Sequence, residues 1–131
     1  MSTDKKTVWL KRVLAAKAAL CLLAWGLPTL IAPISVFHLL GVPTPDDTLF
    51  VRLFGAVVTA FGLAYYYAYR DPVRNVAIVR VGIADNGLVT LTILVFILFF
   101  GLRSAFMWVS AVLTFAFFIC FLLLAPKSEP A

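Results

Sequence analysis

The sequence is poor in charge. Asp, Glu, Lys and Arg make up only 13% of its 131 residues, whereas hydrophobic residues make up 63%. Soluble domains carry about a quarter of their residues as charged side chains, and a chain this short has too much surface for its volume to bury so much apolar area. This balance excludes a soluble globular domain and indicates that most of the apolar surface faces lipid.

The sequence also lacks the motifs that mark many catalytic and metal sites. It has no Gly-rich phosphate loop, nucleophile elbow or metal-ligand repeat. Its two cysteines, Cys21 and Cys120, lie within apolar runs, and their spacing fits neither a metal site nor a disulfide framework. We therefore expect no cofactor and no metal.

One weak metal candidate lies outside the apolar runs. His38 is followed by Asp46 and Asp47, and these residue types can bind metal ions. Arg52 follows the two acids closely, so we expect a local ion pair there instead.

The formal net charge of +5 does not indicate a nucleic-acid-binding protein. The basic residues do not form a face; they flank the apolar runs, which is the pattern of a membrane protein. The expected partner is therefore the lipid bilayer and not nucleic acid.

Four apolar runs are long enough to cross a membrane as helices, which takes about 20 residues. They cover about residues 13–32, 49–68, 76–100 and 105–125, and the connectors between them contain "GVPTPDD", "YRDPVRN" and "GLRS". Backbone groups in lipid must be satisfied internally, so these runs are helices and not open strands. The sequence predicts an all-α fold: a single membrane domain over residues 1–131, forming an antiparallel bundle of four transmembrane helices.

The connector between the first two spans contains a further apolar stretch, "ISVFHLL". It is too short to cross the membrane, so we expect a short interfacial segment there. Pro28 and Pro33 should kink or end the first helix.

The basic residues predict the orientation. One side of the predicted bundle carries most of them: Lys5, Lys6, Lys11, Arg12, Arg70, Arg74 and Lys127. The other side has Arg52 and Arg103, with Asp46 and Asp47 nearby. Because basic loops stay cytoplasmic, we expect a multi-pass protein of the bacterial inner membrane with both termini in the cytoplasm.

The third span contains an acid and an amide in "RVGIADNGL", residues 80–88. Asp85 lies roughly 13 Å along the helix from Val76 and cannot reach the interface. A carboxylate at that depth is costly unless it is paired, so Asp85 should face the interior of the bundle. Arg80 is about one turn into the helix and can extend to the interface.

We predict a polar cluster around Asp85, with these other members: Lys17, Tyr66, Tyr69, Arg80 and Asn86. One interpretation is that these residues hold the helices together. The other is a proton site or ligand site, which is the default hypothesis for an acid within a membrane. The run Tyr65, Tyr66, Tyr67 and Tyr69 should anchor the second span at the interface, and the alternative is that a hydroxyl from this run turns inward to the acid.

The second span carries small residues at helical spacing: Gly55, Ala56, Thr59, Ala60, Gly62 and Ala64. Such residues let membrane helices approach closely. We expect this face to pack within the chain, with a homodimer or a partner protein as the alternative occupant.

The segment "RLFGAVVTAFGLAYYYAYRDPVRNVAIVRVGIADNG", residues 52–87, resembles small four-helix bacterial inner-membrane proteins that are grouped as DoxX-like. These proteins share a Gly-rich second helix and an Arg-Asp-Pro turn that leads into the third. The resemblance covers about a quarter of the chain and implies a fold and a location. The group includes a subunit associated with quinone-linked sulfur oxidation, but no residue here carries that chemistry over.

Two functions remain open. We favour an accessory or partner-binding subunit of a membrane complex, with no chemistry of its own. The alternative is a membrane-embedded site for a lipophilic small molecule (a lipid, quinone or sterol-like compound), in an enzyme or carrier that works through Asp85. The alternative predicts a cavity at the depth of Asp85, bounded by Lys17, Tyr66 and Arg80.

Overall fold

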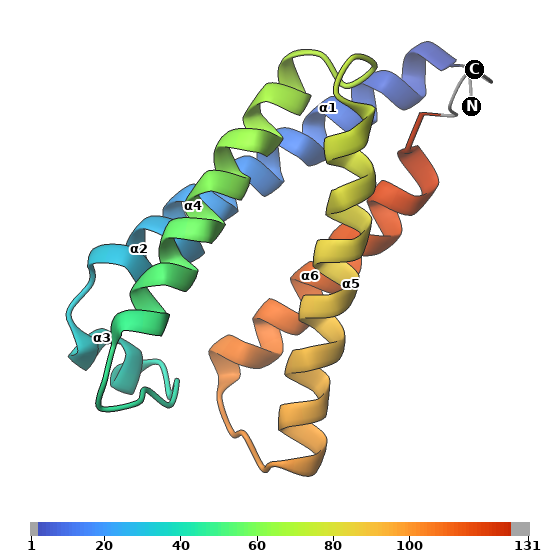
Figure 1. Cartoon of the computed structure of the whole chain (residues 1–131). Helices are drawn as coiled ribbons and strands as arrows, with labels where there is room; N and C mark the ends of the chain where they lie inside the picture. The colour runs from blue at the N-terminus through green and yellow to red at the C-terminus, as the bar shows by residue number, and fades with distance from the viewer. Residues whose placement is uncertain (1–2, 127–131) are drawn as a thin grey trace.

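The computed structural model describes residues 3–126 and builds them from helices and short connectors (Figure 1). The elements in chain order are α1 (Thr3–Leu20), the π-helical segment η1 (Cys21–Gly26), α2 (Leu27–Ile31), α3 (Ile34–Leu39), α4 (Leu49–Arg70), α5 (Val76–Phe99) and α6 (Ala105–Leu124). The all-helical class is therefore confirmed for this part of the chain. Lys127, which contributed to the orientation prediction, lies outside the described residues.

Within residues 3–126, four helices are long and apolar enough to cross a membrane. The first joins α1, η1 and α2 into 28 residues, Asp4–Ile31, and the others are α4, α5 and α6. The last three match the predicted ranges to within two residues. The first helix begins well before residue 13, because the polar stretch ahead of that residue contains no Gly or Pro to stop a helix.

The helices form two packed pairs. The first long helix packs along α4, and α5 packs along α6. Figure 1 shows the two pairs meeting near the end of the molecule where α1 begins and α6 ends, and separating toward the end that carries α3. The buried core lies where the pairs meet and consists of Leu10, Leu14, Ala18, Cys21, Tyr65, Ala68, Val79, Phe117 and Phe121. The end with α3 is therefore the less tightly packed half.

Pro28 accounts for the π-helical segment in the first helix. Proline has no N–H, and its ring collides with the carbonyl four residues earlier, here that of Ala24. The chain responds by widening: the Leu27 N–H donates to the Leu22 carbonyl, five residues back. The helix continues past the proline with a distorted turn in its middle.

Pro33 leaves a second backbone carbonyl without its helical partner. It cannot donate to the Thr29 carbonyl oxygen, and Arg52 Nη1 donates to that oxygen instead, at 2.9 Å. The expected ion pair of Arg52 with Asp46 and Asp47 is therefore wrong: its guanidinium goes to the backbone group that the proline leaves open. This bond also ties the end of the first helix to the start of α4.

Glycines on α4 set how closely the first pair packs. A Cβ added at Gly55 would lie 2.5 Å from the backbone nitrogen of Leu30, and one at Gly62 would lie 2.7 Å from Leu22 Cγ. Thr59 continues this row and faces Gly26. The backbones of η1 and α2 can approach α4 because these positions carry little or no side chain.

The alanines of the predicted packing face lie elsewhere. Ala56 and Ala60 are exposed, and Ala64 is half-buried. Neighbouring positions on a helix point about 100° apart. Because Gly55 and Thr59 face the first helix, the residues that directly follow them, Ala56 and Ala60, point away from it. The predicted within-chain packing is wrong for Ala56 and Ala60.

Candidate ligand-binding cavity

Lys17 is buried inside the bundle, with only 3% of its surface exposed. Its Nζ donates to Asn86 Oδ1 at 2.6 Å and lies 3.8 Å from Asp85 Oδ2. Three aromatic rings surround the ammonium with centroids 5.3–5.6 Å away; they are Trp25, Tyr65 and Phe117. A carboxylate, an amide oxygen and ring faces together offset much of the cost of burying this cation.

Tyr65 holds the carboxylate from the other side. Its hydroxyl donates to Asp85 Oδ2 at 2.9 Å, and its ring stacks on Phe121 with centroids 5.8 Å apart. Gly82 makes room for the ring, because a Cβ there would lie 3.0 Å from Tyr65 Cε1. We refer to Lys17, Tyr65, Asp85 and Asn86 as the Lys17–Asp85 cluster.

The structure changes the membership of the predicted polar cluster. It brings together Lys17, Asp85 and Asn86, with Tyr65 as the tyrosine that reaches the acid. The other predicted members, Tyr66, Tyr69 and Arg80, are exposed on the surface of the bundle. Adjacent helical positions diverge by about 100°, so only one tyrosine of the run can enter the space beside Gly82. The inward hydroxyl, given as the alternative for this run, is present at Tyr65.

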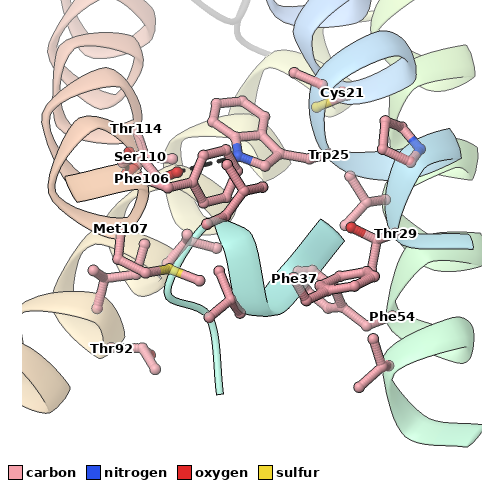
Figure 2. Close-up of a pocket in the computed structure, with 18 of the residues that line it drawn as sticks. Cys21, Trp25, Thr29, Phe37, Phe54, Thr92, Phe106, Met107, Ser110 and Thr114 are labelled. Carbon is pink, nitrogen blue, oxygen red and sulfur yellow. Dashed lines mark hydrogen bonds between the residues drawn. The ribbon is translucent and has the colours of Figure 1, made fainter. Parts of the chain in front are cut away.

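Hydroxyl groups continue the polar track along α5 and α6. Thr90 Oγ1 donates to the Asn86 carbonyl at 2.7 Å and lies 2.8 Å from Thr114 Oγ1. One turn further, Ser110 Oγ accepts a bond of 3.2 Å from Trp25 Nε1, which Figure 2 shows as a dashed line between the two helix pairs. Every buried side-chain nitrogen and oxygen in the described part of the chain has a partner.

A cavity of about 670 Å³ opens between the two helix pairs. Lys17 and Asp85 lie at one end of it, and the remaining walls are mainly apolar and aromatic. Figure 2 shows Trp25, Phe37, Phe54, Phe106 and Met107 around the space, with the hydroxyls of Thr29, Thr92, Ser110 and Thr114 among them. A mainly apolar chamber with a small number of polar groups in its walls is the typical form of a small-molecule site.

The connector after the first helix closes the end of the cavity away from the cluster. Val36, Phe37 and Leu40 of this connector line the cavity. Ser104 Oγ donates to the Leu40 carbonyl at 2.7 Å and also accepts from the backbone N–H of Met107, which caps α6. The short helix α3 is therefore tied to the start of α6 and forms a wall of the chamber.

Some of the residues that line the cavity are also exposed. Phe50 and Phe54 on α4 and Leu88 on α5 are among them, and all three are large and apolar. Tyr66 and Arg80, which the sequence placed at the cavity boundary, do not line it.

The weak metal candidates do not gather in the structure. His38 Nε2 lies 3.0 Å from Thr44 Oγ1, and Asp47 Oδ1 accepts from the Leu49 backbone N–H at 2.9 Å. Among the described residues, no group of three or more His, Cys, Asp or Glu side chains could hold a metal ion.

Trp25, Thr90, Ser110 and Thr114 were missed by the sequence analysis. A signal for them was present as polar spacing: Lys17, Cys21 and Trp25 are four residues apart on the first helix, and all three line the cavity. Ser110 and Thr114 are also four apart, as are Asn86 and Thr90. Such rows lie on one helix face and mark the side that turns toward the other helices.

Comparisons with protein-family models, with curated proteins and with solved structures give no match to this chain.

Proposed function

We propose that the protein is a membrane-embedded binding protein for a lipophilic small molecule. Its four long helices form an antiparallel transmembrane bundle in the bacterial inner membrane, with both termini in the cytoplasm, as the placement of basic residues favours. The ligand's apolar part occupies the cavity, and its polar end lies against the Lys17–Asp85 cluster. The DoxX-like resemblance agrees with this location and remains a prediction.

The observation that carries the proposal is the position of the charged pair. Lys17 and Asp85 both line the cavity, and Asp85 keeps 24% of its side chain exposed although it lies in the middle of a spanning helix. If the pair served only to join helices, the helices would cover both side chains completely, because a side chain exposed to an open cavity gains no packing contacts on that side. A pair at the end of an apolar chamber can instead bind the polar end of a guest.

The size of the chamber limits the guest. A cavity of about 670 Å³ lies within the range of roughly 300–1,000 Å³ that small-molecule sites occupy, so it suits a guest of small-molecule size. The exposed apolar side chains of Phe50, Phe54 and Leu88, which also line the cavity, would let such a molecule arrive from the bilayer between α4 and α5. The protein would then act as a carrier or receptor for a membrane-dissolved compound. We assign no catalytic step.

The test compares the wild type with two variants in which phenylalanine replaces alanine. Each protein is purified in mild detergent, and the bound lipids and proteins are identified by mass spectrometry. Ala24→Phe adds a ring to a residue that lines the cavity, and Ala60→Phe adds the same ring to an exposed position on α4 that does not. We expect one enriched lipophilic compound with the wild type and with Ala60→Phe, and its loss with Ala24→Phe.

The opposite result supports the accessory-subunit prediction instead. A stoichiometric protein partner that Ala60→Phe removes, with no enriched small molecule in any sample, would refute the binding proposal. Retention of the same compound by Ala24→Phe would place the ligand outside the cavity.

A further inference from the structure

The residues that line the cavity also limit which polar end its ligand can carry. Lys17 and Asp85 are the only charged side chains among the described residues that line it, and they carry opposite charges 3.8 Å apart. The lining is therefore neutral as a whole. A ligand with a charged head would bring an uncompensated charge into an apolar site, which is costly.

The hydrogen-bonding capacity of the pair narrows the choice further. Asp85 Oδ2 accepts from Tyr65, while Oδ1 has no hydrogen-bond partner among the described residues. Lys17 uses one N–H on Asn86 at 2.6 Å, and its distance to Asp85 exceeds the usual length of a hydrogen bond. The pair thus retains at least one donor and one acceptor, and both residues line the cavity.

We propose that the ligand is a neutral lipophile that ends in a hydroxyl group, such as a long-chain, isoprenoid or sterol-like alcohol. The hydroxyl donates to Asp85 Oδ1 and accepts from Lys17 Nζ, because a hydroxyl is both donor and acceptor. A ketone or quinone oxygen can only accept and would leave Asp85 Oδ1 unused. A carboxylate end would be repelled by the negative charge of Asp85, and an ammonium end would be repelled by the positive charge of Lys17. This inference rests on the proposed binding function.

The test measures binding of three probes with one shared chain: hexadecanol, the ionised hexadecanoic acid and the protonated hexadecylamine. Native mass spectrometry resolves each complex of the full-length protein. We expect the wild type to bind the alcohol about tenfold or more tightly than either ion, because either ion brings an uncompensated charge into a neutral, apolar site. The matched methyl ketone should also bind more weakly than the alcohol.

Charge variants should reverse this preference. Asp85→Asn keeps the shape of the side chain and leaves Lys17 as a net positive charge, so the acid should become the tightest probe. Lys17→Met leaves Asp85 as a net negative charge and should favour the amine in the same way. If Lys17→Met does not fold, Asp85→Asn alone suffices for the test. Arg80→Met is the matched control, since Arg80 is exposed and does not line the cavity, and it should keep the preference of the wild type.

The outcomes separate this inference from the function on which it rests. If the wild type binds the acid, the amine or the ketone as tightly as the alcohol, and Ala24→Phe abolishes that binding, the cavity binds lipophiles but the hydroxyl assignment is overturned. An unchanged order of probes in Asp85→Asn overturns it as well. If no probe binds, or if Ala24→Phe leaves binding unaltered, both proposals fail.

Discussion

Removing either member of the buried charge pair should destabilise the protein, and removing both should cost less than the sum. Lys17 Nζ and Asp85 Oδ2 are 3.8 Å apart, and at an effective dielectric of about 20 the attraction between unit charges at this distance is about 4 kcal/mol. Lys17→Met leaves the carboxylate with Tyr65 alone. We expect a loss of about 3 kcal/mol in the free energy of unfolding, the lower end for a broken buried pair, because Asp85 is partly exposed.

Asp85→Asn should cost about 2 to 3 kcal/mol, since Lys17 then keeps only the Asn86 oxygen and the ring faces. In the double variant no unpaired charge remains. The coupling free energy, which is the sum of the two single losses minus the double loss, should therefore be about 2 kcal/mol. It should fall short of the full attraction, because Tyr65 and Asn86 partly stabilise whichever charge is left.

The assay is reversible unfolding in bicelles by titration with sodium dodecyl sulfate, followed by circular dichroism. A second cycle with Arg80→Met and Asp85→Asn is the control, since Arg80 lies on the same helix but is exposed. That cycle should be additive to within about 0.5 kcal/mol. Additivity of Lys17→Met with Asp85→Asn would refute the reasoning, and coupling of Arg80 with Asp85 would restore the arrangement predicted from the sequence.

Two further predictions concern the packing between helices. Thr90→Val removes a hydroxyl that bonds to the Asn86 carbonyl and to Thr114, and it should lower the free energy of unfolding by about 0.6 to 1.7 kcal/mol. The control Thr92→Val, at an exposed position on the same helix, should have no measurable effect. Equal losses for the two variants would contradict the row of hydrogen-bonded hydroxyls. Gly55→Val forces a side chain against the backbone of α2 and should destabilise by about 1 to 3 kcal/mol, whereas the same assay should show less than about 0.5 kcal/mol for Ala60→Val.

The sequence predicted the helices well, because length and apolar composition determine which segments can cross a membrane. It also predicted that Lys17 and Asp85 lie at the same level of the bundle, where the structure brings them together, since both positions follow from the rise per residue along their helices. Asn86, which accepts a hydrogen bond from Lys17, was expected to point to another neighbour. It reaches Lys17 because that side chain is long enough to contact two adjacent residues of α5.

The choice among neighbouring residues could not be predicted. Tyr65 and Tyr66 are chemically equal and adjacent, and only the space left by Gly82 decides which ring turns inward. The same holds for Gly55 and Ala56, where hydropathy and size give no preference. The separation of the two helix pairs was also hidden, because it depends on how side chains fill the space between them and not on their order along the chain.

The charged pair borders the core that holds the two helix pairs together, and this bears on whether the pair only joins helices. The two helix pairs are already held together where they meet, by a core that includes Leu10, Leu14 and the stacked rings of Tyr65 and Phe121. Lys17 and Asp85 lie beside this core but also line the cavity. Apolar residues of similar volume would have packed there at no desolvation cost, and such replacements are often neutral or stabilising in proteins. A charged pair with an open acceptor, placed at the boundary between the core and an apolar chamber, is better explained by what it can bind than by what it holds together.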